Sequence, residues 1–104
     1  MSEFTTFRRW TLKDGRQESE VVSLIQDSIV PAYKKLTGCK RLGLLRVEGT
    51  RSYLATQHWE SHAAHSSATV SADYASWLES YTPSLNRWHE IMALEDEWAT
   101  AKVL

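Results

Sequence analysis

Hydrophobic residues recur along the chain with two different spacings. Residues 4 to 12 mix aromatic and β-branched side chains, which favours a β-strand, and the segment that follows, residues 13 to 16, has the composition of a turn. From Glu18 onward the apolar positions are three or four residues apart, which indicates one face of a helix. These positions are Val21, Ile25, Ile29, Ala32 and Leu36. We expect Pro31 to kink or divide this helix and Gly38 to end it.

The second half of the chain predicts a hairpin, two helices and a last strand. Residues 42 to 47 and 53 to 59 form two strands with a Gly-containing connection between them. Ser61 is a good N-cap for a short helix over residues 62 to 69. The spacing of Val70, Tyr74, Trp77 and Tyr81 predicts a longer helix that ends at about Thr82, before Pro83. Residues 91 to 103 alternate loosely and predict the closing strand.

This order of elements predicts an α+β fold in which residues 1–104 form a single domain. The order β-α-β-β-α-β is that of the ferredoxin-like fold, an antiparallel sheet with its helices on one face. Both alternating sets of strand positions carry apolar residues, for example Leu44 and Leu45, or Ala93 and Leu94. Because a second apolar face needs a cover, we expect two copies to pair through their sheets as a homodimer and form a dimeric α/β barrel.

Composition and charge exclude several classes of protein. Twelve Lys and Arg residues against thirteen Asp and Glu residues give a net charge of −1, which argues against nucleic acid and anionic membranes as partners. A hydrophobic content of 42% excludes a disordered chain. The single cysteine, Cys39, cannot form an internal disulfide and is expected to be structural. With no apolar leader or membrane-length run in the sequence, we expect a cytoplasmic protein.

Three segments carry a resemblance to a known family. They are residues 36 to 39, which read Leu-Thr-Gly-Cys, the strand of residues 53 to 59, and the helix entry Trp59-Glu60-Ser61. With these segments the chain resembles the antibiotic biosynthesis monooxygenase-like proteins, over nearly its whole length. The resemblance implies the ferredoxin-like fold, a homodimer, and the chemistry of a monooxygenase that uses no cofactor. Because this fold hosts many functions, the resemblance is more informative about fold than about activity.

The resemblance also implies where a site would lie. In the oxygenases of polyketide pathways, a Trp in a segment like Gln57-His58-Trp59-Glu60-Ser61 lines the pocket between sheet and helices, and Trp59 matches it. An Asn four residues before that Trp is replaced by Ala55, and a Tyr six residues after it is replaced by His65. An Arg farther along has no counterpart near Trp77. The haem-degrading relatives use an Asn on the first strand, a Trp in the helix after the third strand and a His that binds iron. The corresponding positions of this chain hold Arg8, Ser67 and Trp77, so that triad is absent.

The residues themselves suggest how a cofactor-free oxygenation would work. A neutral imidazole near pH 7 can take a phenolic proton, which makes His65 the candidate catalytic base beside Trp59. An aromatic cage and a cationic donor would hold the resulting anion of a small aromatic or polyketide-like substrate. The candidate substrate-binding residues are Tyr74, Trp77, Arg9 and Arg46.

Each of these residues also has a plainer interpretation. Trp59 packs the core whether or not anything binds, and a His on a short helix is more often solvated than catalytic. His58, His62 and His65 have metal-like spacing, but Ser61 separates the first from the other two, so no metal site is expected. The alternative function is a non-catalytic dimeric domain that binds a ligand.

Overall fold

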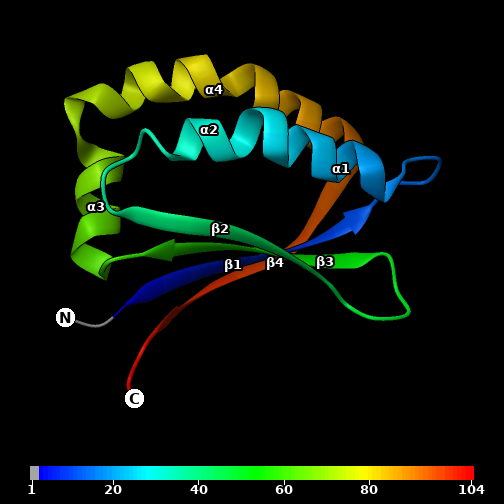
Figure 1. Ribbon diagram of the computed structural model, residues 1–104, viewed down its shortest axis with the longest axis horizontal. Helices are drawn as coiled ribbons and strands as arrows, with labels where there is room; N and C mark the ends of the chain where they lie inside the picture. Colours follow the sequence, from blue (N-terminus) through cyan, green and yellow to red (C-terminus); the bar gives the residue numbers. More distant parts are fainter. Residues whose placement is uncertain (1–2) are drawn as a thin grey trace.

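The computed structural model describes residues 3–104 and contains one antiparallel sheet of four strands. The strands are β1 (Phe4–Leu12), β2 (Cys39–Arg46), β3 (Ser52–Trp59) and β4 (Met92–Ala101), in the spatial order β2-β3-β1-β4. Every pair of neighbouring strands is antiparallel (Figure 1). Because β1 lies between β3 and β4, the first and last strands of the chain are neighbours in the sheet. The predicted α+β, ferredoxin-like fold is confirmed.

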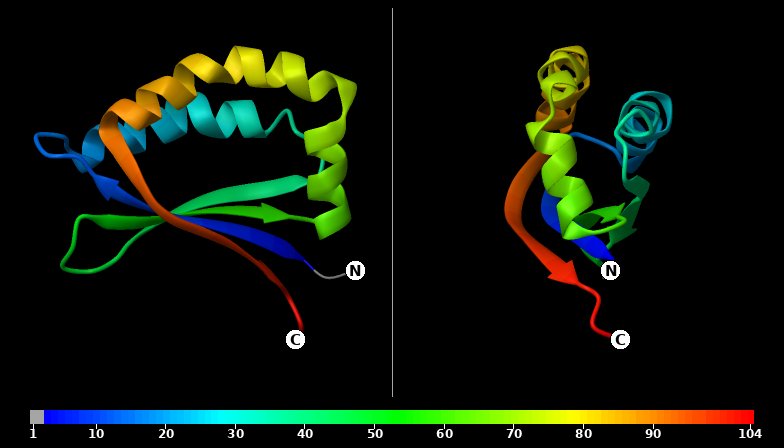
Figure 2. Two further views of the ribbon diagram at one scale, coloured as in Figure 1. Left: turned by 180° about the vertical axis from the view of Figure 1, so that it is seen from behind. Right: turned by 90° about the vertical axis from the view of Figure 1, so that its left-hand side faces the viewer.

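The helices all lie on one side of this sheet. α1 (Glu18–Leu24), η1 (Ile25–Ile29) and α2 (Val30–Tyr33) follow one another without a break, and α4 (Ala72–Ile91) lies beside them (Figures 1 and 2). The short α3 (His62–Val70) stands at one end of the sheet and connects β3 to α4 (Figure 2). The space between sheet and helices is therefore closed at this end by α3.

The predicted cap of α3 is confirmed, whereas the first helix ends at Tyr33, five residues before Gly38. The Ser61 hydroxyl accepts a hydrogen bond from the backbone N–H of Ala64 at 3.0 Å and caps α3, as its position predicted. Gly38 adopts a φ of +91°, which favours glycine, in the turn into β2. A Cβ at Gly38 would also lie 2.9 Å from that of Ala64, so this turn packs directly against α3.

Pro31 marks the point where the first helix widens instead of ending. The N–H of Val30 bonds to the carbonyl of Ile25, five residues earlier, so η1 is a turn of π-helix. Proline has no N–H and crowds the carbonyl four residues before it, and a wider turn removes that clash. The predicted division at Pro31 is thus a local π-helical turn, which directs Ile25 and Ile29 toward the sheet.

The predicted end of the long helix at Thr82 is wrong. α4 continues through Pro83 to Ile91, and the closing strand begins at Met92. Pro83 is exposed, so its ring lies on the solvent side of the helix. Burial of the apolar residues beyond it, Trp88 and Ile91, stabilises the continued helix despite the missing hydrogen bond. The apolar spacing of this helix therefore continues past the proline.

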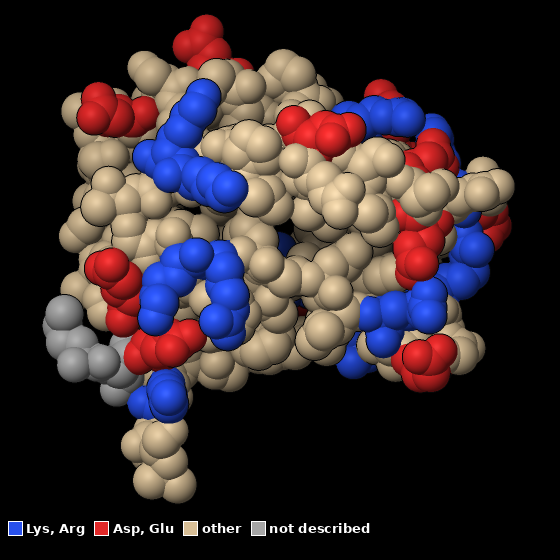
Figure 3. Space-filling model, viewed as in Figure 1, with Lys and Arg blue, Asp and Glu red and all other residues tan. Residues whose placement is uncertain are grey.

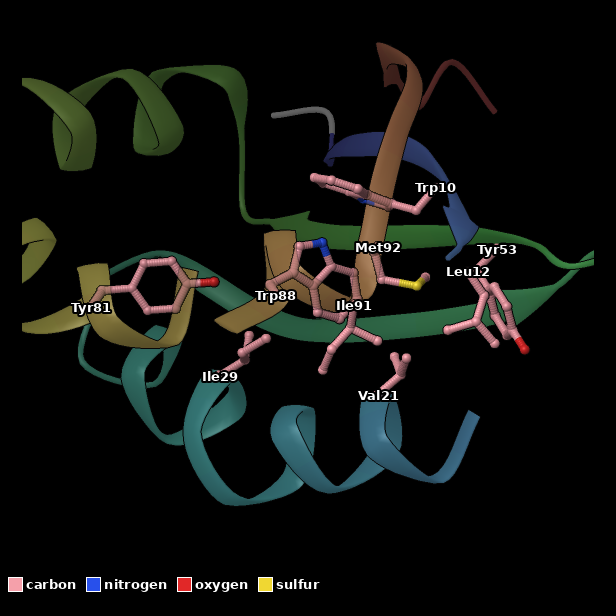
Figure 4. Close-up of a cluster of buried hydrophobic side chains, with 9 residues drawn as sticks. All are labelled: Trp10, Leu12, Val21, Ile29, Tyr53, Tyr81, Trp88, Ile91 and Met92. Carbon is pink, nitrogen blue, oxygen red and sulfur yellow. The ribbon is translucent and has the colours of Figure 1, made fainter. Parts of the chain in front are cut away.

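The core lies between the helices and the sheet. Trp10 and Trp88 meet edge to face with their ring centroids 5.4 Å apart, and Val21, Ile91 and Met92 are almost completely buried around them (Figure 4). Such aromatic pairs add stability beyond the area they bury. The cluster also contains Leu12, Ile29, Tyr53 and Tyr81.

The other face of the sheet carries apolar residues that no helix covers in the described part of the chain (Figure 2). Trp98 of β4 stacks on Phe7 of β1 with the ring centroids 5.4 Å apart, and 39% of Trp98 is exposed. Leu45 of β2 is exposed on the same face. This uncovered face is the one on which the expectation of a homodimer depends.

Candidate functional site

A cavity of about 90 Å³ lies between the sheet and the helices. Residues of β1, β2 and β3 form its floor, and residues of η1, α2 and α4 form its roof. Figure 3 shows a hollow between the first helix and β2, framed by uncharged residues. The lining residues are Thr6, Arg8, Trp10, Ile25, Ile29, Tyr33, Leu42, Gly43, Ala55, Thr56, Gln57, Tyr81, Leu85 and Trp88.

Among the described residues that line this cavity, Arg8 is the only charged one. Successive residues of a strand point to opposite faces, so Arg8 lies on the helix side with Trp10 and Arg9 lies on the uncovered side. The Nε of Arg8 donates to Glu97 of β4 at 3.1 Å, and 42% of the Arg8 side chain remains exposed. An ion pair this accessible stabilises the fold by less than about 1 kcal/mol. The remaining N–H groups of Arg8 can serve a ligand.

A chain of hydrogen bonds connects Trp59 to the cavity. The indole Nε1–H of Trp59 donates to Oε1 of Gln57 at 3.2 Å, and Nε2 of Gln57 donates to the hydroxyl oxygen of Tyr33 at 3.1 Å. Tyr33 and Tyr81 meet edge to face with ring centroids 5.5 Å apart. Three residues of the chain, Gln57, Tyr33 and Tyr81, therefore present polar groups at the cavity wall.

Both tyrosine hydroxyls of the cavity are held in the protonated form. Burial raises the pKa of Tyr81 well above its usual range, and the neighbouring Tyr33 raises it further. Burial also raises the pKa of Tyr33, against an opposing effect of the Arg8 charge. At neutral pH these groups are therefore hydrogen-bond donors and acceptors, and neither is a base.

Trp59 and His65, the candidates from the sequence, lie next to this cavity and not in its wall. Only 1% of Trp59 is exposed, and its N–H is used by Gln57, so it is not free for a ligand. His65 of α3 packs edge to face on Trp59, with ring centroids 5.0 Å apart, and also contacts Phe4. Burial lowers the pKa of His65, and the charges of His62 and Arg8 lower it further, so the ring is neutral near pH 7.

Of the other four predicted residues, Tyr74 and Trp77 lie together, and Arg9 and Arg46 lie apart from them. Trp77 stacks between Tyr74 and Tyr81 and donates its N–H to the carbonyl of Ala32 at 2.8 Å. Tyr74 and Trp77 line a separate open groove between α3, α4 and the loop before β2. Arg9 lies on the uncovered face of β1.

Arg46 lies elsewhere again, at the far end of β2. Its guanidinium pairs with Glu18 at 2.8 Å and with Glu48 at 3.7 Å, so it connects the hairpin to the start of α1. The contacts that Arg46 makes with these two carboxylates give it a structural role.

The histidines with metal-like spacing are also separated. His58 lies on the uncovered face of the sheet, 3.4 Å from the Thr5 hydroxyl, whereas His62 and His65 both pack on Phe4 at the end of the sheet. Among residues 3–104 no three His, Cys, Asp or Glu side chains lie close enough together to hold a metal ion. Cys39 is half-buried, and burial raises the pKa of its thiol, so it has no reactive thiolate.

The sequence analysis missed the polar residues of the cavity wall, although signals for them were present. Arg8 and Trp10 are two residues apart on one strand and therefore face the same side of the sheet, and the same holds for Gln57 and Trp59. Tyr81 was recognised only as part of an apolar helix face. Tyr33 follows Ile29 by four residues, which was a signal for the same face, but Ala32 and Leu36 were the predicted continuation of that face.

Solved structures of other proteins share this fold. SnoaB, a cofactor-independent oxygenase from Streptomyces nogalater, superposes with a TM-score of 0.72 at 18% identity, covering 100% of this chain and 96% of its own. A candidate antibiotic biosynthesis monooxygenase from Bordetella bronchiseptica gives 0.64 at 21% identity over the whole of both chains. A nipsnap family protein of unknown function from Agrobacterium tumefaciens gives 0.63 at 11% identity, covering 96% of this chain and 86% of its own.

Other comparisons give no further assignment. No protein-family model and no curated protein sequence matches the chain. In residues 3–104 no helix combines the length and the apolar composition needed to cross a membrane. At 21% identity or less, the structural likenesses establish architecture, and the activity has to be argued from the site. The chain has the fold of the antibiotic biosynthesis monooxygenases, as the resemblance of its sequence implied.

Proposed function

We propose that the protein is a homodimeric, cofactor-independent monooxygenase that acts on a small phenol bound in the cavity between sheet and helices. The observation that carries this proposal is the position of Arg8, a single cation in an otherwise uncharged, largely aromatic and aliphatic wall. A positive charge in such surroundings favours the ionised form of a phenol, because the opposite charge stabilises the anion. SnoaB, which has this fold, is a cofactor-independent oxygenase.

The size of the cavity limits the substrate. A cavity of about 150 Å³ lined by apolar side chains holds benzene. The cavity here measures about 90 Å³, so a single ring requires small shifts of the wall, and a fused polyketide requires the helices to move apart. Ile25 and Leu85 are the partly buried aliphatic side chains of the roof that can make room. We therefore narrow the expected substrate to a single-ring phenol.

The reaction needs no reductant other than the substrate. The bound phenolate transfers an electron to O₂, and the two radicals combine at a ring carbon that carries hydrogen. Loss of water from the resulting peroxide leaves a quinone. One oxygen atom enters the ring, the other leaves as water, and both hydrogens of that water come from the phenol. All the electrons that O₂ takes up are thus supplied by the ring.

The proposal is tested by oxygen consumption with a panel of single-ring phenols under ¹⁸O₂. We expect one labelled atom in the quinone and no hydrogen peroxide. Arg8→Gln should lower turnover about tenfold or more, because a charged hydrogen bond to the anion is lost. Arg9→Gln changes the neighbouring residue on the other face and should retain turnover. The proposed site would be contradicted if Arg9→Gln lost turnover while Arg8→Gln retained it, or if no phenol in the panel led to oxygen consumption.

A specific observation favours a second candidate, a domain that binds a small aromatic molecule without turning it over. Among the described residues that line the cavity there is no carboxylate or imidazole to act as a base, since His65 lies behind Trp59. In that case a phenol would quench the fluorescence of Trp10 and Trp88 in the cavity wall, and no oxygen would be consumed. The ¹⁸O₂ experiment separates the two candidates.

The homodimer is part of the same proposal. Phe7, Trp98 and Leu45 on the uncovered face of the sheet support it, because an exposed apolar patch of this kind marks an interface. A second copy placed on this face would cover these side chains. A cytoplasmic location stays a prediction from the sequence.

A further inference from the structure

We infer that Trp59 and Gln57 are positioning residues, which direct the hydroxyl hydrogens of Tyr33 and Tyr81 toward an oxyanion bound in the cavity. This inference rests on the proposed function for the identity of the ligand, a phenolate, but its test does not depend on oxygen chemistry. It assigns a role to Trp59 that acts through another residue and needs no contact between the indole and the ligand.

The first step is the direction of the hydrogen bond between Trp59 and Gln57. An indole N–H can only donate, so the atom of the Gln57 amide that faces it must be the oxygen. The amide nitrogen then has to face Tyr33, 3.1 Å away, and the Tyr33 oxygen has to accept. The orientation of a Gln amide is usually ambiguous, but here the chemistry of Trp59 fixes it.

The second step is a count of hydrogens. Tyr33 and Tyr81 have one hydroxyl hydrogen each, and a hydrogen bond between the two hydroxyls would use only one of them. Because Gln57 donates to Tyr33, neither tyrosine hydrogen is used in a bond to Gln57. At least one tyrosine hydrogen therefore remains free, whichever tyrosine donates to the other. Both hydroxyls lie at the cavity wall, so the remaining hydrogen is available to a ligand.

The third step is the balance of groups around the ligand. The charged or titratable residues in the cavity wall are Arg8 from β1, Tyr33 from α2 and Tyr81 from α4, and Glu97 from β4 pairs with Arg8 at its exposed edge. Gln57 has a second amide hydrogen, and Arg8 has further N–H groups. The wall is therefore rich in donors, with Thr6 and Thr56 as its other hydroxyl groups, and suits a ligand that accepts hydrogen bonds.

The experiment measures how strongly the cavity favours the anion of a bound phenol. The probe is 4-fluorophenol, whose ¹⁹F chemical shift reports its ionisation, titrated with pH in the presence of the full-length protein. In the wild type we expect the pKa of the bound probe to lie below its value in water. In Gln57→Glu, a carboxylate accepts from both Trp59 and Tyr33, so the tyrosine hydrogen turns away; this loss and the added negative charge should together raise the bound pKa by about one unit or more. Tyr33→Phe removes the hydrogen without adding a charge, and a rise in the bound pKa of that variant isolates the contribution of the hydrogen.

Trp59→Phe removes the donor that fixes the amide and should raise the bound pKa in the same direction. Because Trp59 is almost completely buried and its replacement can unfold the protein, Gln57→Glu and Tyr33→Phe carry the test if that variant does not fold. Tyr53→Phe is the matched control, since this buried tyrosine donates to Glu18 outside the cavity.

The outcomes are distinct. An unchanged pKa of the probe in folded Gln57→Glu and Tyr33→Phe would overturn the inference even if the enzyme consumes oxygen. A rise in these variants, with Tyr53→Phe unchanged, would support it even if no oxygen is consumed.

Discussion

At the scale of single residues, neighbouring positions on one strand have different roles. Arg8 and Arg9 have the same chemistry, yet one lines the cavity and the other lies on the uncovered face, because side chains alternate along a strand. The sequence analysis favoured Arg9 because nothing in the residue types distinguishes the two. Trp10 is buried on the helix side of the sheet, and Arg8, two residues before it, points to the same side. The position of Trp10 therefore distinguishes Arg8 from Arg9.

The environment of His65 makes stability depend on pH. Burial lowers the pKa of this residue from its ordinary value of 6.5, so the unfolded chain binds a proton that the folded protein does not. The wild type should therefore lose stability as the pH falls below about 6.5, until the lower pKa of the folded state is reached. We expect His65→Asn, which has no such proton to take up, to lose less stability over this range.

This prediction is checked by urea denaturation at several pH values between 7 and 5. The wild type and His65→Asn are compared at each pH, so that other titrating groups cancel. A constant difference between the two midpoints would show that His65 has the same pKa in both states.

The candidate site could be predicted only in part, for reasons visible at this scale. Trp59 was expected in the wall of the pocket, whereas in the structure it is buried next to the cavity and reaches it through Gln57. Gln57 and Tyr33 could not be paired from the sequence. Their contact depends on how far the helix containing Tyr33 is rotated, and the turn of π-helix sets that rotation.

At the scale of elements, the strands were predicted well and the helix ends were not. The limits of β1 and the end of β3 agree with the alternation of aromatic and β-branched residues. The helices fail at prolines: Pro31 lies in a widened helix and Pro83 in an uninterrupted one. Local propensity disfavours both arrangements, and burial against the sheet outweighs it in each case.

The proline inside α4 leads to a prediction about stability. Pro83 cannot donate to the carbonyl of Glu79, and its side chain is exposed, so it contributes little packing. Pro83→Ala restores the hydrogen bond and should stabilise the fold by about 1–3 kcal/mol, after allowance for the more flexible unfolded chain. Thermal denaturation should show a rise in Tm of several degrees.

A control for this change lies in the same helix. Ser76→Ala alters another exposed position of α4 without a proline and should change Tm much less. A lower Tm for Pro83→Ala would mean that the ring itself stabilises this turn of the helix.

At the scale of the whole molecule, the two faces of the sheet differ in what covers them. One face is buried under the helices (Figure 2), and on the other face Trp98 and Leu45 are exposed. If two copies pair through this face, Trp98→Lys should place a charge in the interface and convert the dimer to a monomer. Sedimentation velocity at micromolar concentration measures the change directly.

The matched control is Leu78→Lys. Leu78 lies on α4, on the opposite side of the molecule, and its exposed fraction of 37% is close to the 39% of Trp98. The control should sediment like the wild type. A wild type that is monomeric at high micromolar concentration would contradict the homodimer.

The position of β4 has one more consequence. As the last strand in the sheet it has a neighbour on only one side, and all of its residues after Met92 are exposed. A long free edge of this kind is a template for fibrous aggregation. Here three consecutive acidic residues, Glu95, Asp96 and Glu97, occupy the middle of the strand. If the β4 strand of another copy lay alongside this edge, like charges would meet. At neutral pH the molecule therefore resists edge-to-edge association of its sheets into ribbons.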